Sequence, residues 1–498
     1  MRRRGGRGSA GVVTMIFLPH IFLLTGWIQD LVFEILYKLY GSRCYGFVWN
    51  VKASFIALLF FLYFAALCFF HIMPYKEKQR MPDFASHPYV KQRMPGSASH
   101  PYVREKISPR LKIMKGGRII LRLCFFGMIA QLFFYLLRLP DYFLRYVNSS
   151  GIPQMIIDGI LTFLFFYFLI LNGSIRILCT CRSLGIWKRL LFACWLFIPV
   201  VHLLPLKYLS KRAKIEYDAE CCRFENRKHR DGAMLCATRY PIILLHGIGF
   251  RDLQYFNYWG RIPKELVRNG ATVYYGHQEA WGTIENNAYI IRETIKEVLK
   301  ETNCDKVNII AHSKGGLDAR YLISGLHMED HVASLTTMST PHRGSELLNL
   351  LNKLPDGIYH LVSSMFDLAY RRMGDQHPDC YHASKQLSYE FCQEFNEKYP
   401  DSPKVYYQSY ASIVKHTLGD NLLSVPNLLM FLAGAPKNDG LVTMQSAKWG
   451  NFKKTFISTG RRGISHGDMI DLKREDYKGF DVIEAYVEIV SELKTMGF

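Results

Sequence analysis

The chain has 498 residues, of which 49% are hydrophobic, and a formal net charge of +20, so it is long enough for more than one domain. Its basicity is confined to one part, because residues 1–230 hold 33 Lys and Arg against 11 Asp and Glu, whereas the remainder holds 29 against 31. A segment that is both basic and apolar indicates contact with anionic lipid headgroups, and this distribution excludes nucleic acid as the expected partner.

Apolar runs recur through the first 206 residues. They are Gly11–Tyr37, Ala53–Phe70, Ile119–Leu137, Gly159–Asn172 and Leu190–Pro205. Runs of this length and composition are typical of membrane spans, although the first contains two acidic residues and is either a span or an interfacial helix. A cleavable signal peptide does not explain runs so far along the chain. We therefore expect residues 1–206 to form an all-α, multi-span membrane domain of four or five helices.

A basic loop between the second and third runs contains a tandem repeat at residues 78–103. Lys78–Val90 recurs as Lys91–Val103 and differs only at Gly96 and Ser97. Its Pro, Ser and basic residues indicate a solvated, irregular segment, and the charge favours the cytoplasmic side of a membrane. With five spans the C-terminal part would be extracytoplasmic, which we slightly favour. The basic cluster that follows the last run favours the opposite side, so the sidedness stays open.

A charged segment, residues 207–239, is predicted to link this region to one globular domain over residues 240–498. Within that domain, apolar strand-like runs alternate with helical patterns such as Ile290–Lys300 and Asp481–Lys494. The runs are Ile242–Leu245, Thr272–Tyr275, Val307–Ile310, Ser334–Met338, Val405–Ser409 and Thr455–Ser458. Such alternation predicts an α/β domain with a mostly parallel sheet and helices on both faces.

The first of these strands ends in His246-Gly247. The backbone amide that follows such a dipeptide, here that of Ile248, is well placed to bind a developing oxyanion if the domain performs acyl transfer. We expect the imidazole of His246 to shape this loop rather than to transfer protons.

The run Val307–Gly316 is the most informative part of the chain. A β-branched strand stops at Ser313, with the small residues Ala311 and Gly315 two positions away on either side. Such a pattern is typical of a nucleophile elbow, in which a sharp turn from strand to helix exposes the serine hydroxyl. Ser313 is the candidate nucleophile, and the amide of Lys314, at the start of the helix, is the second expected oxyanion donor.

A serine nucleophile needs a histidine to accept its proton and a carboxylate to orient that histidine. Asp439 lies in the Gly-containing turn Asn438–Val442, and His466 lies in a second Gly-flanked loop, which satisfies the chain order Ser, Asp, His of α/β-hydrolases. Each also has an ordinary interpretation, because Asp before Gly is common in turns and loop histidines are often only exposed.

From residue 240 onward the chain resembles the bacterial triacylglycerol lipases of the α/β-hydrolase superfamily, including the calcium-dependent secreted enzymes. The matching signatures are Leu245–Gly247, Ala311–Gly316, Ser339–Ser345, Phe395–Pro400 and Asn438–Val442. The resemblance implies an α/β-hydrolase fold with Ser313, Asp439 and His466 as its triad. It also favours a helical lid at Glu346–Arg372, where the pattern predicts two short amphipathic helices; an ordinary pair of core helices is the alternative.

Some calcium-dependent relatives connect the histidine loop to a neighbouring loop through two aspartates. Asp420 and Asp468 fall at similar places in this chain, so the resemblance implies a structural calcium ion bound by these carboxylates and nearby carbonyls. No organic cofactor is required for the chemistry.

Together these features predict a membrane-anchored serine lipase or carboxylesterase whose substrate is a lipid ester. A phospholipase, a deacylase of a lipid-linked glycan and an acyltransferase would share the same triad. A membrane transporter or scaffold with an inert hydrolase part is an alternative of another class, which the intact Ser, Asp and His set disfavours.

Overall fold

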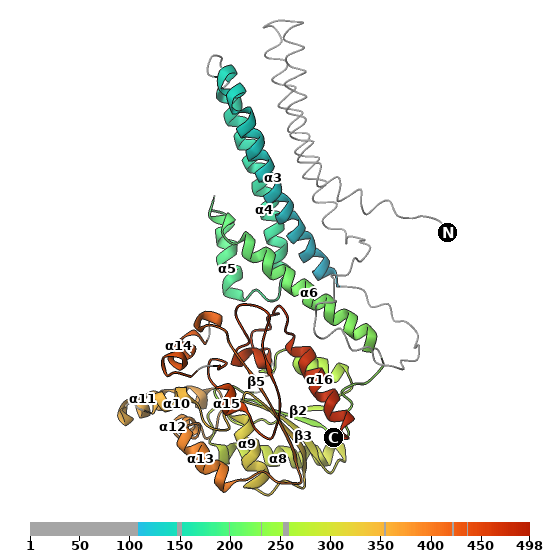
Figure 1. The fold of residues 1–498 in the computed structure, drawn as a ribbon, viewed down its shortest axis with the longest axis vertical. Coiled ribbons are helices and arrows are strands. Elements are labelled where there is room, and N and C mark those ends of the chain that lie inside the picture. The colour runs from blue at the N-terminus through green and yellow to red at the C-terminus, as the bar shows by residue number, and fades with distance from the viewer. Residues whose placement is uncertain are drawn as a thin grey trace, which may run out of the picture. The chain divides into compact units, whose positions relative to one another are not determined.

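The computed structural model describes residues 108–146, 152–198, 200–230, 232–251, 258–352, 355–420, 423–435 and 437–498 (Figure 1). The chain divides into two compact units between Cys221 and Cys222. The apolar runs Gly11–Tyr37 and Ala53–Phe70 and the tandem repeat at 78–103 lie outside the described residues.

Two long helices form the core of the first unit. Helix α3 (Pro109–Tyr146) lies beside α4 (Ile152–Thr180), and apolar side chains of the two helices pack in one cluster (Figure 1). The backbones approach closely where both helices have glycine, because a Cβ atom at Gly117 would lie 2.7 Å from the carbonyl oxygen of Gly173. Small residues at this crossing therefore determine how tightly the helices pack.

The three expected membrane spans that begin within the described residues are not supported by the structure. Ile119–Leu137 and Gly159–Asn172 lie within α3 and α4, but Leu190–Pro205 is not one helix, since α5 (Ile186–Trp195) ends after 10 residues and a 3-10 turn, η3 (Val201–Leu203), follows. Among the residues that the structure describes, none of the helices is both long and apolar enough to cross a bilayer.

Most of the segment predicted to be a charged linker is helical. Helix α6 (Leu206–Arg230) has 25 residues and is rich in Lys, Arg and Glu, which favour helix as strongly as they favour solvent. Glu216 of α6 belongs to the first unit, where its buried carboxylate accepts hydrogen bonds from the backbone N–H and the hydroxyl of Ser183 at 2.9 and 2.8 Å. The charged composition of this segment therefore belongs to a helix that packs in the first unit and not to a solvated linker.

The second unit is built on a sheet of six parallel strands. They are β1 (Ile242–Leu245), β2 (Val273–Tyr275), β3 (Val307–His312), β4 (Val332–Met338), β5 (Tyr406–Ser412) and β6 (Asn451–Phe456). Their order in the sheet is β2-β1-β3-β4-β5-β6, and every neighbouring pair is parallel. Since parallel strands have their carboxyl ends at one edge, the loops that follow them can converge on one site.

Helices cover both faces of this sheet, as the sequence predicted. Ile242 and Leu244 pack with α7 (Ile262–Arg268) and α16 (Val482–Thr495), whereas Ile243 and Leu245 pack with α8 (Ile284–Thr302) and α9 (Gly315–Ser324) (Figure 1). Successive side chains of β1 therefore serve opposite cores, which is why its sequence is apolar without alternation.

The strand predictions fail only at the sheet edge. The first five runs coincide with β1 to β5 within two or three residues at their ends, but β6 spans Asn451–Phe456 instead of Thr455–Ser458. Lysines at positions 453 and 454 interrupt the apolar pattern from which a strand is predicted. An edge strand can carry such charged side chains, and they also discourage pairing with other chains.

The remaining elements lie in the connections after β4, β5 and β6. They are α10 (Glu346–Leu351), α11 (Asp356–Arg372), α12 (Cys380–Lys385), α13 (Tyr389–Lys398), η4 (Thr417–Gly419), α14 (Ser424–Leu432), α15 (Met444–Ala447) and η5 (His466–Ile470). Helices α10 and α11 are the pair of helices expected at Glu346–Arg372.

Candidate active site

Ser313 lies in the sharp turn between β3 and α9. The strand ends at His312 and the helix begins at Gly315, and Ser313 has a φ of 54°, in the left-handed region that residues with a Cβ rarely adopt. The close approach of the preceding loop requires glycine at position 315, because a Cβ there would lie 2.5 Å from the carbonyl oxygen of His246. This is the local geometry of a nucleophile elbow.

His466 and Asp439 form a buried hydrogen-bonded pair. Nδ1 of His466 lies 2.9 Å from Oδ2 of Asp439, and the backbone N–H of His466 donates to the carbonyl of Asp439, also at 2.9 Å. The other carboxylate oxygen, Oδ1, accepts the amides of Leu441 at 3.1 Å and Val442 at 2.9 Å. The carboxylate is therefore fixed on both sides, and it leaves Nε2 of the imidazole as the nitrogen available for proton transfer.

His312 connects this pair to the elbow. Its Nε2 lies 3.1 Å from the carbonyl oxygen of His466, the two imidazole centroids are 4.4 Å apart, and its Nδ1 lies 2.6 Å from the hydroxyl of Tyr258. Because a carbonyl only accepts, Nε2 of His312 must donate, so Nδ1 accepts from Tyr258. Burial lowers the pKa of His312 well below its usual value, as does the nearby His466, which keeps the ring neutral. His312, the residue before Ser313, thus packs directly against His466.

Of the two expected oxyanion donors, one lines the same cavity as Ser313 and the other follows it in the chain. Ile248 lines the same cavity as Ser313, and Lys314 is the N-cap residue of α9, where the helix dipole favours negative charge. The Lys314 ammonium does not reach the cavity, because it pairs with Asp318 at 2.6 Å and both side chains are 1% exposed. Only the backbone of Lys314 can therefore contribute.

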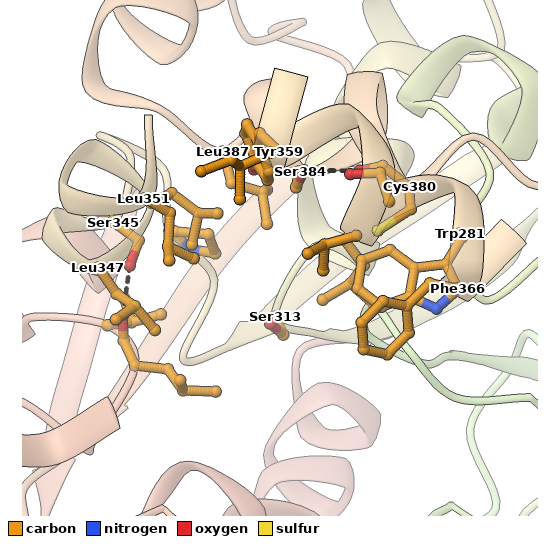
Figure 2. A pocket seen from close by; sticks show the side chains of 18 residues that line it. Trp281, Ser313, Ser345, Leu347, Leu351, Tyr359, Phe366, Cys380, Ser384 and Leu387 are labelled. Carbon is orange, nitrogen blue, oxygen red and sulfur yellow. Dashed lines mark hydrogen bonds between the residues drawn. The ribbon is translucent and has the colours of Figure 1, made fainter. Parts of the chain in front are cut away.

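An apolar cavity of about 350 Å³ opens above Ser313. Figure 2 shows Ser313 at its base, with side chains of α10, α11 and α12 around it and Trp281 to one side. Two of the lining serines are used by the protein itself: Ser384 bonds to Tyr359 at 2.7 Å, and Ser345 donates to the carbonyl of Leu441 at 2.6 Å. The lining thus offers mainly hydrocarbon to a ligand, and it contains the candidate nucleophile, Ser313.

Helix α11 is apolar on two faces. Ile358, Val362 and Phe366 line the cavity. Leu361 and Met365 do not, and they are 65% and 66% exposed. The solvent-facing side of an amphipathic helix normally carries polar residues, so exposed apolar residues on this outer face are unusual.

Asp420 and Asp468, the expected calcium ligands, do lie together, but they already hold cations. Arg462 donates to both carboxylates, and Lys473 donates to Asp420. Burial raises the pKa of Asp420, but hydrogen bonds from Lys473 and Ser465 outweigh it, so the pKa is held below its usual value. Among the described residues there is also no group of three or more His, Cys, Asp or Glu suited to a metal. The residues present do not fit a calcium ion.

Sequence reasoning missed several residues of the site. Tyr258 and Arg462 carry no local signal, because their partners His312 and Asp420 are 54 and 42 residues away. Trp281 joins the cavity lining from the loop after β2. His312 was visible in the elbow pattern, and its position before the nucleophile was the one signal that could have identified it.

The second unit is similar to known hydrolases. Residues 241–476 match the family described as palmitoyl protein thioesterase. Triacylglycerol lipase 2 of Saccharomyces cerevisiae is 33% identical over 270 residues, which cover 50% of this chain and 77% of the yeast protein. A triacylglycerol lipase of Vibrio cholerae is 31% identical over 241 residues, covering 43% of this chain and 75% of the bacterial protein.

Among solved structures, the mature form of a Bacillus licheniformis lipase is 20% identical to this chain, with a TM-score of 0.39. The match covers 51% of this chain and 92% of the bacterial lipase.

Proposed function

Because the chain belongs to the triacylglycerol lipase family and is a carboxylic-ester hydrolase, we propose that it hydrolyses long-chain acyl esters of lipids through Ser313, Asp439 and His466. One observation carries the proposal. The hydrogen-bonded pair of Asp439 and His466 is held beside the elbow by His312, and Ser313 faces an apolar cavity.

The proposed mechanism needs only the chain's own residues. His466 takes the proton of Ser313 as its oxygen attacks the ester carbonyl, and the backbone amides of Ile248 and Lys314 stabilise the resulting oxyanion. When the intermediate collapses, His466 protonates the leaving alcohol and an acyl group remains on Ser313. Water then attacks this acyl-enzyme, again with His466 as base, and releases the carboxylic acid.

We propose that α10 and α11 form a lid over the acyl-binding cavity. The inner face of α11 completes the apolar lining, and its outer face offers Leu361 and Met365 to a lipid surface. Contact with lipid would replace the water around that outer face, and this gain favours opening of the lid at an interface.

Filling the cavity should shorten the preferred acyl chain. In Val362→Trp the larger ring would occupy space that the distal acyl chain needs. Each methylene that loses its burial costs about 0.8 kcal/mol, so exclusion of three should lower kcat/KM for a 16-carbon p-nitrophenyl ester by about 50-fold. The four-carbon ester should react at nearly the wild-type rate. The measurement is kcat/KM across p-nitrophenyl esters of 4 to 16 carbons in detergent.

Leu361→Trp is the matched control, since it adds the same ring one residue away on the outer face of α11. It should leave the chain-length profile unchanged. Equal losses for short and long esters in Val362→Trp, or a flat profile in the wild type, would argue against a long acyl chain in this cavity.

A thioesterase is the second candidate, and the match of residues 241–476 to palmitoyl protein thioesterases favours it. The same nucleophile and oxyanion donors would cleave a thioester, with a thiol as the leaving group. Wild-type kcat/KM for palmitoyl-coenzyme A and for p-nitrophenyl palmitate, measured in the same detergent, separates the two. A preference of tenfold or more for the thioester would make thioester hydrolysis the main activity. Phospholipase and acyltransferase activities would use the same steps and differ only in headgroup or acceptor.

We also propose that Gly11–Tyr37 and Ala53–Phe70 anchor the protein to a membrane, whereas the extracytoplasmic position of the hydrolase domain depends on five spans and stays a prediction. This rests on the sequence of those runs and on the basic charge of residues 1–230. Extraction of cell membranes with alkaline carbonate tests the anchoring, since release of the protein into the supernatant would exclude it. Protease protection of the hydrolase domain in sealed vesicles tests the sidedness.

A further inference from the structure

Two loops of the second unit meet beside the histidine of the candidate triad. One follows β5 and contains Asp420; the other follows β6 and contains His466. Their backbones pair directly, because the N–H of Ile464 donates to the carbonyl of Ile413 at 2.8 Å and the N–H of Lys415 donates to that of Arg462 at 3.0 Å. The position of His466 therefore depends on the contact between these loops.

The side chain of Arg462 fastens the two loops together. Its Nη2 donates to Oδ2 of Asp420 at 2.8 Å and to Oδ1 of Asp468 at 3.2 Å, and its Nη1 donates to Oδ2 of Asp468. Asp468 is two residues after His466 in the short helix η5, so the guanidinium connects the histidine loop to the Asp420 loop. A planar guanidinium can bond one carboxylate through two nitrogens while also bonding another, which a lysine ammonium does less rigidly.

Every oxygen of the two carboxylates has a donor. Besides Arg462, Asp420 accepts from Lys473 through Oδ1 and from the hydroxyl of Ser465 at 2.5 Å through Oδ2. Asp468 accepts from the amide of Ser465 at 2.8 Å and from the hydroxyl of Tyr477 at 2.6 Å. Each of the four carboxylate oxygens therefore already accepts at least one hydrogen bond.

The charges of the cluster also balance. Asp420 and Asp468 are each 1% exposed, whereas Arg462 and Lys473 are 24% and 23% exposed, so two buried negative charges meet two cations that reach the surface. A divalent ion added to this cluster would leave it with an uncompensated charge of +2 in a largely buried place, and calcium requires six to eight oxygen ligands.

We propose that Arg462, assisted by Lys473, is a built-in cation that takes the place of a calcium ion and positions His466 for catalysis. The proposal rests on the function proposed above. It assigns Arg462 a positioning role, since the guanidinium acts on His466 through Asp468 and the loop. It also implies that hydrolysis needs no calcium.

Removing both cations should turn the cluster into a calcium site. In the double variant Arg462→Met/Lys473→Met, two buried carboxylates would lose their counter-charges, and such carboxylates are the hard oxygen ligands that calcium prefers. Without calcium, kcat should fall by about 10- to 100-fold, the scale expected for a small displacement of a catalytic group. Millimolar calcium chloride should restore most of the loss and raise Tm by about 3 °C. The wild type should respond neither to calcium chloride nor to EDTA, in kcat or in Tm.

The matched control is Arg227→Met/Lys453→Met. It removes an arginine 25% exposed and a lysine 23% exposed, whose acidic partners, Glu265 and Glu492, lie outside the site. This variant should keep the wild-type kcat and show no calcium response. Should the Arg462 double variant not fold, Arg462→Gln alone and the wild-type EDTA titration still test the proposal.

Three results would overturn the proposal. The first is inactivation of the wild type by EDTA with recovery in calcium, and the second is a wild-type kcat in the calcium-free double variant. The third is a folded double variant whose Tm does not change when calcium is added. Failure of the proposed function looks different. A wild type that hydrolyses no ester would end that proposal, whereas the Tm measurements would still show whether the two cations fill the site.

Discussion

Ser313→Ala is expected to lower kcat for ester hydrolysis by about 10⁴- to 10⁶-fold, the scale on which serine hydrolases depend on their nucleophile. The residual rate would come from the oxyanion donors and the cavity, which the change leaves in place. Because alanine keeps the Cβ, the elbow at φ 54° is no more strained than before, so Tm should be close to that of the wild type. The loss should therefore be chemical and not structural.

The measurement is covalent labelling by a fluorescent fluorophosphonate, together with hydrolysis of triolein and of a p-nitrophenyl ester. Ser384→Ala is the matched control, because Ser384 lines the same cavity but bonds to Tyr359 and to the carbonyl of Cys380. Labelling and turnover should disappear in Ser313→Ala and persist in Ser384→Ala. An unchanged labelling rate in Ser313→Ala would place the nucleophile elsewhere.

The sheet was predictable where its strands are buried on both faces. Ile309 and Ile310 of β3 belong to opposite core clusters, so a continuous apolar run was needed there and was visible in the sequence. The β6 strand was misplaced because Lys453 and Lys454 hide it. Its pairing with β5 comes from the backbone, from Gln408 with Asn451 onward, and side-chain pattern carries little of that information.

The candidate site was predictable where its chemistry is local. Ser313 is recognisable because strand, turn and helix must meet within a few residues, and small neighbours are required there. Arg462 was not recognisable, because Gly460–Gly463 reads as a solvated basic loop and its role appears only when Asp420, 42 residues earlier, is brought against it. The same limit applies to α6, where a charged composition was compatible with both a linker and a helix.

Asp439→Asn is expected to lower kcat by about 10⁴-fold while leaving KM nearly unchanged. The backbone amides of Leu441 and Val442 donate to Oδ1 of Asp439, so the oxygen of an asparagine would remain on that side and its NH₂ group would face His466. Nδ1 of His466 would then have to accept a hydrogen bond instead of donating one. The proton of the neutral ring would move to Nε2, which could no longer take the proton of Ser313.

The substitution changes the hydrogen bonding that orients His466 but not the packing around it. Asparagine has nearly the size of aspartate, and the cavity above Ser313 is untouched. The fluorophosphonate labelling rate should fall together with kcat, while Tm and the chain-length profile stay close to those of the wild type. Asp305→Asn, on an exposed loop, should have no effect on any of these. If Asp439→Asn kept its rate within tenfold, the hydrogen bond from His466 to Asp439 would be a structural contact only. The proton of Ser313 would then have to leave by a route that does not depend on the tautomer of His466.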